Sequence, residues 1–572
     1  MSLPEPYPTA RRLIRSFLSG QIEVAGDLLP KHRLSLLCIC PDSASFLPVP
    51  PEVENWLSLS REGNPLSWTL RLANGLTDFL IDCALRHPHP PLVLAFENAE
   101  PEDPLDREFL AVLHRRADPA IVSLLFDATR EGPDSNGCEI AEDPESLSAA
   151  SSRSMYLAFY EAARCYCLRG RELIQSDRRN PHYKDLTRNL LFASLLLGRF
   201  SEVEALCKEE IERSRDPALL GNVTYAQAIL NVRLYEPSRR DFAAARRWIE
   251  KSMAYNEMLP LSEKRSVNHA FLRNTLALIE MRTGNPERAE ELLTEALDYI
   301  KREAPARFDE ECVLLFHNRA RLKTFQRQPE AAIEALSTLL RHQPGISEAL
   351  LDRGLLHERA GRPEAALRDF EEAIRWSPPY PEAAFNKARA LTALDRRHEV
   401  LTAWHRCLTL SPDHIEALTG RACLYYDLRD FAASRLDAES VLRLSPGHAR
   451  LLCLRGLLEL EDGDTEQACA SFTRSLEIDP ALADPWANRA VIRFRQGDVE
   501  GAESDLNQAI RLRPDPSALY NRGRVFESRN EWEKAIEDYS RALSFSTRDT
   551  SSIQRHLNRC LRLSVQDHLP GR

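Results

Sequence analysis

Residues 347–380, SEALLDRGLLHERAGRPEAALRDFEEAIRWSPPY, contain the pattern that decides the fold of this chain. Two helix-like segments are closed by Pro378, and prolines return every 34 residues along the C-terminal half, at Pro344, Pro378, Pro412, Pro446, Pro480 and Pro514. A fixed period of this length indicates a repeat architecture in which each unit packs only on its neighbours. The spacing therefore predicts a solenoid and makes binding, rather than catalysis, the first functional hypothesis.

Small residues recur inside each repeat. Counting Ser347 as position 1, position 8 holds Ala320, Gly354, Ala388, Ala422, Gly456, Ala490 and Gly523. Position 20 holds Ala332, Ala366, Ser434, Ala468, Ala502 and Ala535, with Val400 as a departure, and position 24 holds an aromatic residue or Leu except at Ala438. A larger residue at position 8 or 20 would force two packed helices apart. The proline at position 32 cannot continue a helix, so each hairpin must turn into the next.

This pattern resembles the tetratricopeptide repeat. The resemblance implies a mainly α fold, a right-handed superhelix (α-solenoid), with seven consecutive repeats over residues 313–549: 313–346, 347–380, 381–414, 415–448, 449–482, 483–515 and 516–548. Irregular hairpins are expected over residues 153–312, as three loose pairs around 150–176, 183–213 and 218–256 and a clear pair around Leu276 to Ala296. Residues 550–572 are expected to supply a capping helix and a tail.

Composition limits the function classes. The chain has 572 residues and a formal net charge of -11, which argues against non-specific binding of nucleic acid, because phosphate neutralisation needs a basic surface. The sequence lacks an apolar run of about 18 residues, and its first residues lack an apolar signal core. We therefore expect a cytoplasmic protein without a membrane partner, and the excess of Arg over Lys suggests a GC-rich, bacterial genome.

The 13 cysteines do not predict a metal site. Only Cys38 with Cys40 and Cys165 with Cys167 are close in sequence, and such a spacing does not provide the four ligands of a structural zinc. We expect most cysteines to be small buried hydrophobic residues. No cofactor is predicted.

Residues 1–131 do not follow the repeat and predict a small α/β domain. The predicted elements are a strand over residues 33–40, a helix over 66–85, a strand over 91–97, a helix over 104–116 and a strand over 120–126. Residues 132–152 are rich in acidic residues, Ser, Pro and Gly and predict a linker.

Residues 91–104 resemble the second half of a STAND-class signalling ATPase core. In that family an apolar strand ends in two acidic residues, and here Glu97 and Asn98 occupy that pair, while Asp127-Ala128-Thr129-Arg130 occupies the sensor end of the next strand. The chain has no Gly-x-x-x-x-Gly-Lys-Ser/Thr phosphate loop, and Asn98 replaces an expected carboxylate. The resemblance thus implies a degenerate, truncated pseudo-ATPase, kept as a packing domain or as a docking site for a second protein. The alternative is an unrelated small α/β domain.

The resemblance to the repeat family also implies which residues face a ligand. Positions 2, 5, 6, 9, 12 and 13 would line the concave surface, and position 6 carries asparagine four times, as Asn318, Asn386, Asn488 and Asn521. An asparagine ladder can hold an extended peptide, because each amide both donates and accepts a hydrogen bond. The alternative is that each asparagine bonds within its own hairpin. On the same surface we expect the anchors Phe385, Tyr426, Phe494, Tyr520, Arg321, Arg389 and Arg524.

Basic residues fill position 7, as Arg319, Arg353, Lys387, Arg421, Arg455, Arg489 and Arg522. We expect a structural role, in which their stems pack between hairpins and their charged ends reach Asp or Glu on neighbouring hairpins. No repeat carries the set of residues that the family uses to clamp a carboxylate. The favoured function is a non-enzymatic scaffold or adaptor that captures a protein or peptide in the groove. The alternative is a nucleotide-responsive regulator whose N-terminal domain still binds ATP.

Overall fold

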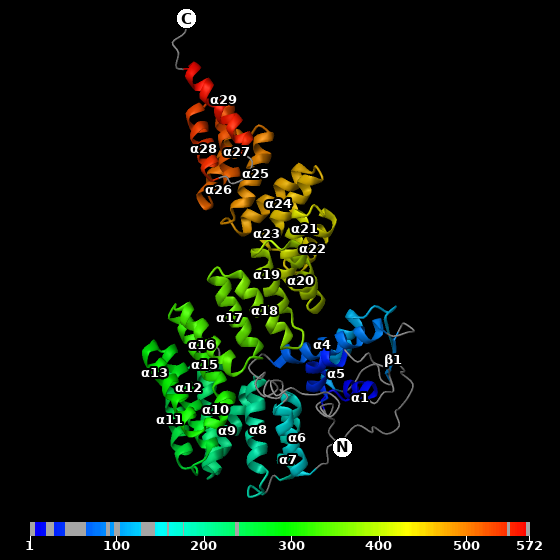
Figure 1. Ribbon diagram of the computed structural model, residues 1–572, viewed down its shortest axis with the longest axis vertical. Helices are drawn as coiled ribbons and strands as arrows, with labels where there is room; N and C mark the ends of the chain where they lie inside the picture. Colours follow the sequence, from blue (N-terminus) through cyan, green and yellow to red (C-terminus); the bar gives the residue numbers. More distant parts are fainter. Residues whose placement is uncertain are drawn as a thin grey trace. The chain divides into compact units, whose positions relative to one another are not determined.

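The structure, a computed structural model, describes residues 6–18, 28–40, 65–86, 92–96, 103–126, 143–156, 159–174, 177–234, 240–545 and 550–567. The described chain is mainly α-helical, and most of its helices pair into successive hairpins, as the repeat pattern predicts (Figure 1). It divides into two compact units, Met1–Arg396 and Arg397–Arg572.

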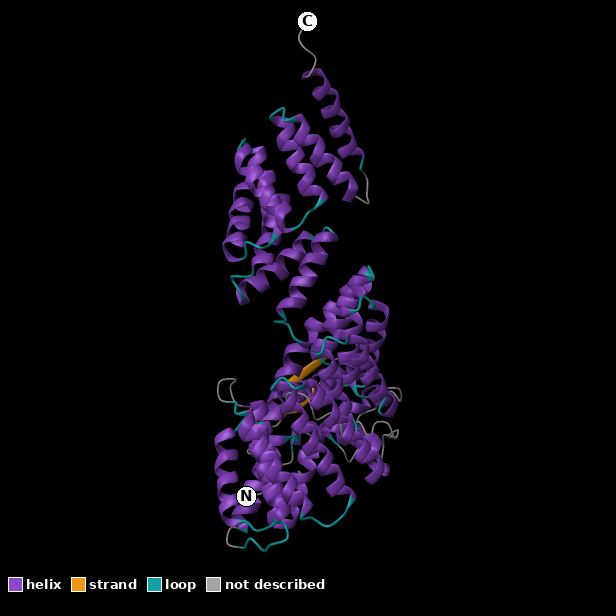
Figure 2. Ribbon diagram, turned by 90° about the vertical axis from the view of Figure 1, so that its left-hand side faces the viewer, coloured by secondary structure: helices purple, strands orange, loops and turns teal. Residues whose placement is uncertain are grey.

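The first unit begins with helices around a two-stranded parallel sheet. The elements are α1 (Pro8–Leu18), α2 (Leu28–Ile39), α4 (Pro65–Leu85), β1 (Leu92–Phe96), α5 (Pro104–Arg116) and β2 (Val122–Phe126). Leu92 lies opposite Val122 and Phe96 opposite Phe126, with α5 as the crossover between the strands, which Figure 2 shows in orange. Asp103 caps α5 by accepting hydrogen bonds from the backbone N–H groups of Leu105 and Asp106. The helices and strands predicted over residues 66–85, 91–97, 104–116 and 120–126 are confirmed.

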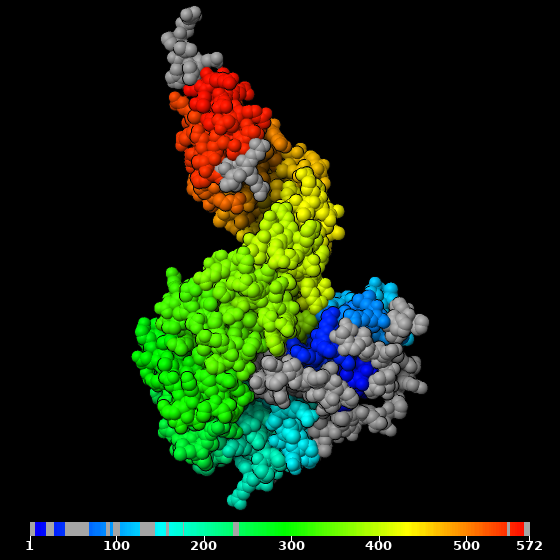
Figure 3. All heavy atoms as spheres, viewed as in Figure 1, coloured from blue at the N-terminus to red at the C-terminus, as the bar shows by residue number. Residues whose placement is uncertain are grey.

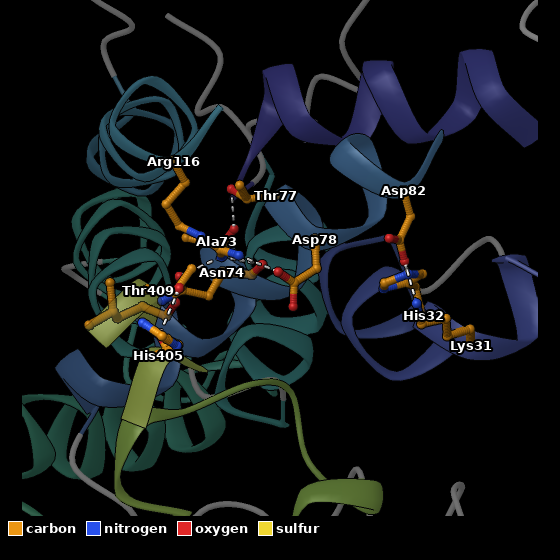
Figure 4. Close-up of polar contacts among 11 residues, drawn as sticks. Lys31, His32, Ala73, Asn74, Thr77, Asp78, Asp82, Arg116, His405 and Thr409 are labelled. Atoms are coloured by element: carbon orange, nitrogen blue, oxygen red, sulfur yellow. Dashed lines mark hydrogen bonds and ion pairs between the residues drawn. The ribbon is translucent and has the colours of Figure 1, made fainter. Parts of the chain in front are cut away.

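The strand predicted over residues 33–40 is wrong, because this segment belongs to helix α2. A short apolar run is compatible with both the strand period of about 2 residues and the helical period of about 3.6. Here residues three or four apart face α4, as in a helix. His32 Nε2 lies 2.7 Å from Asp82 Oδ2 (Figure 4), and a Cβ on Gly75 would lie 1.9 Å from Ser35 Oγ. The close packing on α4, which the missing side chain of Gly75 permits, therefore selects the helix.

Arg116, at the end of α5, joins this helix to α4. Its guanidinium donates to the Asn74 side-chain oxygen at 2.8 Å and to the Asn74 backbone oxygen at 3.1 Å, and it pairs with Asp78 (Figure 4). The Asn74 backbone carbonyl and the Asp78 carboxylate are both largely shielded from water, which strengthens their bonds to Arg116. The crossover helix is thereby fixed to the helical layer.

The N-terminal domain also packs on hairpins that are far from it in sequence. The guanidinium of Arg71 in α4 lies 3.9 Å from the ring centroid of Tyr380 and donates to Glu348 Oε1 at 3.1 Å. The same apolar core contains Phe159 and Ala193, which belong to the first hairpins of the solenoid. The domain thus bridges the start of the solenoid and a repeat about 190 residues further along.

The predicted linker is only partly correct. Residues 144–152 are helical, because α6 (Pro144–Tyr156) begins with a cap in which Asp143 accepts from the N–H groups of Glu145 and Ser146. Residues 132–142 lie outside the described residues. So do Glu97, Asn98 and residues 127–130, so the ATPase resemblance stays a prediction there.

The irregular region forms hairpins. They are α6 with α7 (Tyr160–Leu173), α8 (Tyr183–Leu196) with α9 (Phe200–Arg213), α10 (Pro217–Ile229) with α11 (Phe242–Glu257), and α12 (Glu263–Arg282) with α13 (Pro286–Glu303). A π-helical turn, Leu230–Leu234, extends α10, and the short helices Pro305–Arg307 and α14 (Phe308–Glu311) lead to the regular repeats. Figure 3 shows the side chains of the later hairpins of this unit, in green, as an unbroken surface. The expected looser pairs are confirmed.

The regular repeats follow, each with two helices of 13 or 14 residues. In the first unit these are α15 (Val313–Phe325), α16 (Pro329–His342), α17 (Ser347–Arg359), α18 (Pro363–Arg375) and α19 (Pro381–Ala393). In the second unit they are α20 (Arg397–Leu410), α21 (Ile415–Asp427), α22 (Phe431–Leu444), α23 (Ala449–Glu461), α24 (Thr465–Ile478), α25 (Ala483–Arg495), α26 (Val499–Leu512), α27 (Pro516–Ser528) and α28 (Trp532–Phe545). The capping helix is α29 (Ser551–Asp567). Most second helices end two residues before the repeating proline, because a proline disfavours helical backbone at the residue before it.

Position 15, between the two helices of each repeat, has a positive φ. This holds for Arg327, Gly361, Asp395, Arg429, Gly463, Gly497 and Asn530, with φ from 53° to 88°. Left-handed backbone at this place ends the first helix and starts the turn to the second. Gly198 and Gly284 take the same conformation in the irregular hairpins, which explains why their turns resemble those of the repeats.

The two helices of a hairpin meet at positions 8 and 24, whose sizes complement each other. A Cβ added to Gly354 would lie 2.5 Å from the Phe370 ring, and Gly456 with Phe472 and Gly523 with Tyr539 give 2.7 and 2.6 Å. In two of the four repeats with alanine at position 8, those of Ala320 and Ala490, position 24 is leucine, Leu336 and Leu506. In the glycine repeats the ring occupies the space of a Cβ, whereas leucine leaves room for a methyl group. Ala388 with Trp404 and Ala422 with Ala438 depart from both combinations.

We predict that Gly354→Ala destabilises the α17–α18 hairpin by about 1–3 kcal/mol, because the added methyl overpacks Phe370. Adding Phe370→Leu should recover part of the loss, since an Ala and Leu pair packs in other repeats. Native-state hydrogen exchange of α17 and α18 measures both. Gly221→Ala in α10 is the matched control, because its Cβ would lie 3.7 Å from the nearest atom, and it should stabilise by about 0.5–1 kcal/mol. Equal losses for the Gly354 and Gly221 variants would contradict the complementarity.

Position 7 carries a second repeated interaction. Arg353, Arg421, Arg489 and Arg522 each form two hydrogen bonds to the aspartate 16 residues later, Asp369, Asp437, Asp505 and Asp538, at 2.6–2.9 Å. A further N–H reaches the preceding hairpin, from Arg353 to Ser337, from Arg489 to Thr473 and from Arg522 to Asn507. The structural role predicted for position 7 is confirmed. The carboxylate, however, lies on the same hairpin in these repeats, whereas Arg319 and Lys387 reach Glu290 and Glu371 on the preceding one.

We predict that Arg489→Ala costs about 2–3 kcal/mol, because it removes two hydrogen bonds to Asp505, which is only 1% exposed and keeps Arg493, at 3.1 Å, as its remaining counter-ion. Arg455→Ala is the matched control at the same repeat position. Its hydrogen-bond partner 16 residues later is the neutral Ser471, and its ion pair with Glu459, at 3.5 Å, lies on its own helix, so the loss should be about 1 kcal/mol. Hydrogen exchange of α23 to α26 measures both variants. Similar losses at the two sites would show that the ion pair is not what stabilises the hairpin.

Candidate functional site

The predicted asparagine ladder is not uniformly accessible. Asn318 is 1% exposed, and its Nδ2 donates to Asn274 Oδ1 in α12 at 2.9 Å. Asn386 is 9% exposed. Both side chains are buried, and the Asn318 amide is engaged between α12 and α15. The partner of Asn318 lies on the preceding hairpin, so the alternative of a bond within its own hairpin is wrong for this residue.

Asn488 and Asn521 in the second unit are half-buried and reachable. Asn488 Nδ2 lies 4.0 Å from Cys453 Sγ. Arg524 is exposed, and its guanidinium lies 5.8 Å from the ring centroid of Phe494 on the preceding first helix. The structure therefore brings Phe494 and Arg524 together on the first-helix face.

The remaining predicted anchors are scattered and partly occupied. Arg389 lies 5.8 Å from the ring centroid of Phe385 but also pairs with Glu358 at 2.9 Å. The Tyr426 hydroxyl lies 3.5 Å from Glu461 Oε1, and the Tyr520 hydroxyl lies 3.2 Å from Ser552 Oγ of the capping helix α29. Tyr520 is thus engaged by the cap.

Arg321 is exposed and lines a cavity of about 290 Å³ with Asp352 and Arg359. At its base His317 Nε2 lies 2.7 Å from Asp352 Oδ2. This cavity lies between α15 and α17, the first helices of adjacent repeats.

A larger cavity, of about 690 Å³, lies among the irregular hairpins of the first unit. We call it the basic cavity. Its walls come from the first helices α8, α10 and α12, with Ser252 and Asn256 of α11 and the loop of residues 258–262, which joins α11 to α12. This volume is within the range of roughly 300–1,000 Å³ that is typical of ligand sites.

Four cations line the basic cavity: Lys184, Arg188, Lys264 and Arg265. Among the described residues that line it, none is Asp or Glu. Burial lowers the pKa of His269 in α12, the charges of Arg273 and Arg265 act in the same direction, and the charge of Glu257 acts against them. The cavity is therefore locally positive in a chain whose net charge is -11.

Aromatic side chains supply the apolar part of the cavity. Phe192 from α8 and Tyr225 from α10 lie with ring centroids 6.2 Å apart, and Phe271 comes from α12. Aromatic rings with cations nearby are typical anchors of protein interfaces. The wall can therefore receive both an apolar group and a negative one.

A hydrogen-bond network holds the wall in place. Asn256 Nδ2 donates to the Arg265 carbonyl oxygen at 3.1 Å, and Arg265 Nη1 donates to the Leu259 carbonyl oxygen at 2.9 Å. Ser262 Oγ accepts from the Arg265 N–H at 3.2 Å and so caps α12. The loop is thereby fixed to both helices, and the cavity is preformed.

The basic cavity could not be identified from the sequence. Its lining residues come from helices whose repeat spacing has diverged, so the positions that face inward cannot be assigned by counting. One signal was present, because α12 has 20 residues, whereas the first helices of the regular repeats have 13. A longer first helix after a Pro260-containing loop indicates added surface at that hairpin.

Two further features of the described residues bear on function. None of the described helices is long and apolar enough to span a bilayer. Most of the cysteines that the structure describes are buried, as expected, and Cys165 and Cys423 are exposed.

The comparison with protein families identifies the repeats. A family model described as Tetratricopeptide repeat matches residues 317–384, 352–396, 419–483 and 488–551. The matched segments are tetratricopeptide repeats and lie in both units. No curated protein matches the chain in sequence.

Several solved structures are similar to this chain. A tetratricopeptide repeat protein from Parabacteroides merdae is 20% identical over 44% of this chain and 99% of its own, with a TM-score of 0.38. Yeast Tom70 is 14% identical over 74% of this chain and 96% of its own, with a TM-score of 0.31. The APC/C hetero-tetramer Cut9-Hcn1 contributes a chain that is 13% identical over 73% of this chain and 96% of its own, with a TM-score of 0.36.

Proposed function

We propose that this chain, which carries tetratricopeptide repeats in both of its units, is a non-enzymatic scaffold that captures a segment of another protein on its first-helix faces. The observation that carries the proposal is the basic cavity, because it is preformed and lined by first helices of successive hairpins. A solenoid presents such faces without a separate binding domain, since each hairpin contributes one strip of surface.

The surface beside the cavity supports a macromolecular partner. Met258 and Leu261, in the loop that forms one wall, are 66% and 88% exposed. Large apolar side chains that stand out beside a preformed cavity are typical of protein interaction sites. A partner that filled only the cavity would leave both of them in water.

We propose a second contact surface in the other unit, at Asn488, Asn521, Phe494 and Arg524. The half-buried amides and the Arg524 and Phe494 pair support it. Asn386 and Asn318 are left out of this surface, since both are buried.

We predict that a benzoylphenylalanine photo-crosslinker placed at Tyr225, in the basic cavity, forms a discrete protein adduct in lysate of the source organism. The matched control is the same crosslinker at Glu334, an exposed position on the second helix α16, which should give no discrete adduct. Excess unlabelled chain should compete for the adduct. A Met258→Ser/Leu261→Ser competitor should act about tenfold less well, because it has lost two apolar contacts.

Two outcomes of the crosslinking experiment would contradict the scaffold. Identical adducts from Tyr225 and Glu334, or adducts that unlabelled chain does not displace, would mean that the cavity face has no specific protein partner. Asn488→Ala/Asn521→Ala tests the second surface with the crosslinker placed at Phe494. The variant should weaken the adduct at Phe494 without changing the adduct at Tyr225.

A further inference from the structure

We infer that the basic cavity recognises an acidic segment of its partner polypeptide, with one apolar side chain of that segment seated against Phe192, Tyr225 and Phe271. This inference rests on the proposed function and adds the chemistry of the captured segment. Three observations carry it: uncompensated positive charge, a buried amide oxygen without a donor, and an exposed apolar loop at the rim.

The positive charge of the cavity is only partly compensated within the chain. Lys184 Nζ lies 3.2 Å from Asp216 Oδ2, and Arg188 pairs with Asp185 at 2.9 Å. In contrast, no carboxylate of the described residues lies within 4.0 Å of the charged groups of Lys264 or Arg265. Two cations are therefore available for carboxylates from outside, and the aromatic walls lower the local polarity, which strengthens such a pair.

The buried amide points to a peptide rather than a small anion. Asn256 is 5% exposed, and its Oδ1 has no hydrogen-bond donor among the described residues, while its Nδ2 is held by the Arg265 carbonyl oxygen. A buried acceptor without a donor is costly, so a bound group that donates an N–H is favoured. The backbone of an extended segment offers an N–H beside each side chain, whereas inorganic phosphate near neutral pH offers at most one or two O–H donors.

The exposed loop sets the size of the partner. Met258 and Leu261 do not line the cavity, so a ligand that contacts only its lining, within about 690 Å³, leaves both side chains exposed. A polypeptide that enters the cavity with an acidic and apolar segment can also cover these two side chains. Charge, hydrogen bonding and apolar surface thus agree on one class of ligand.

The first test uses two tetramethylrhodamine-labelled, C-terminally amidated hexapeptides with the full-length chain. The acidic probe is Asp-Glu-Leu-Phe-Asp-Glu and the neutral probe is Asn-Gln-Leu-Phe-Asn-Gln, so that only side-chain charge differs and no terminal carboxylate is present. Fluorescence anisotropy should give a dissociation constant at least about tenfold lower for the acidic probe at low salt, and about 0.5 M KCl should remove most of this difference.

The second test changes the cavity. Lys264→Glu should weaken the acidic probe by about fivefold or more and the neutral probe by less than about twofold. Lys301→Glu is the matched control, because Lys301 is an exposed residue of α13 that does not line the cavity, and it should leave both probes unchanged. Lys264 is exposed, so its variant should fold, and an unchanged circular dichroism melt verifies this. Equal binding of the two probes, or equal effects of the two variants, overturns the inference.

The third test separates this inference from the proposed function. The protein segment joined to the crosslinker at Tyr225 is sequenced by mass spectrometry, and we expect at least two Asp or Glu residues beside an apolar one. A specific adduct to a segment without acidic residues overturns the acidic preference but leaves the scaffold intact. Failure to form any specific adduct removes the proposed function itself. Displacement of the acidic probe by an equal concentration of inorganic phosphate would identify a small-anion site and overturn the inference as well.

Discussion

The close approach of two helices at positions 8 and 24 is the constraint on which the regular repeats depend. Gly354 lies so close to Phe370 that an added Cβ would be 2.5 Å from the ring, and five of the seven regular repeats have glycine with an aromatic residue or alanine with leucine at these positions. At the helix spacing that this contact sets, the arginine at position 7 bonds to the aspartate 16 residues later. In several repeats it also bonds to the preceding hairpin. Packing within a hairpin and stacking between hairpins are thereby coupled through neighbouring positions of one helix.

The irregular hairpins keep the paired-helix architecture but differ in the spacing of their small residues, in helix length and in one loop. There the small residues no longer recur at a strict spacing, α12 is longer, and the loop of residues 258–262 stands between two helices as a wall. The result is a preformed cavity where the regular repeats have a closely packed seam. Its four cations contrast with the acidic chain, and this contrast, together with Met258 and Leu261 at the rim, is what makes the surface a candidate for specific capture.

The fold could be predicted largely from periodicity, and the candidate site could not. The 34-residue spacing placed the helices and their ends, because a helix does not continue through a proline beyond its first turn. The short apolar run of α2 was misassigned as a strand, since its period is ambiguous until Gly75 offers it a helical neighbour. The asparagines at position 6 share a register but not an environment: Asn318 meets Asn274 between helices, whereas Asn488 stays reachable. Register predicts which way a side chain points, and burial depends on the residue that faces it.

The sequence by itself determined the hairpin, its turn, the small residues at its seam and the number of regular repeats, because these depend on contacts between residues at fixed separations along the chain. Only the tertiary structure decided that α4 would pack on Tyr380 and Glu348, and that Lys264, Phe192 and Asn256 would share a cavity. Those contacts join residues separated by tens to hundreds of positions, and no repeated spacing in the sequence predicts them. They arise from the curvature and helix lengths of hairpins whose pattern has diverged, and these geometric quantities are set by packing.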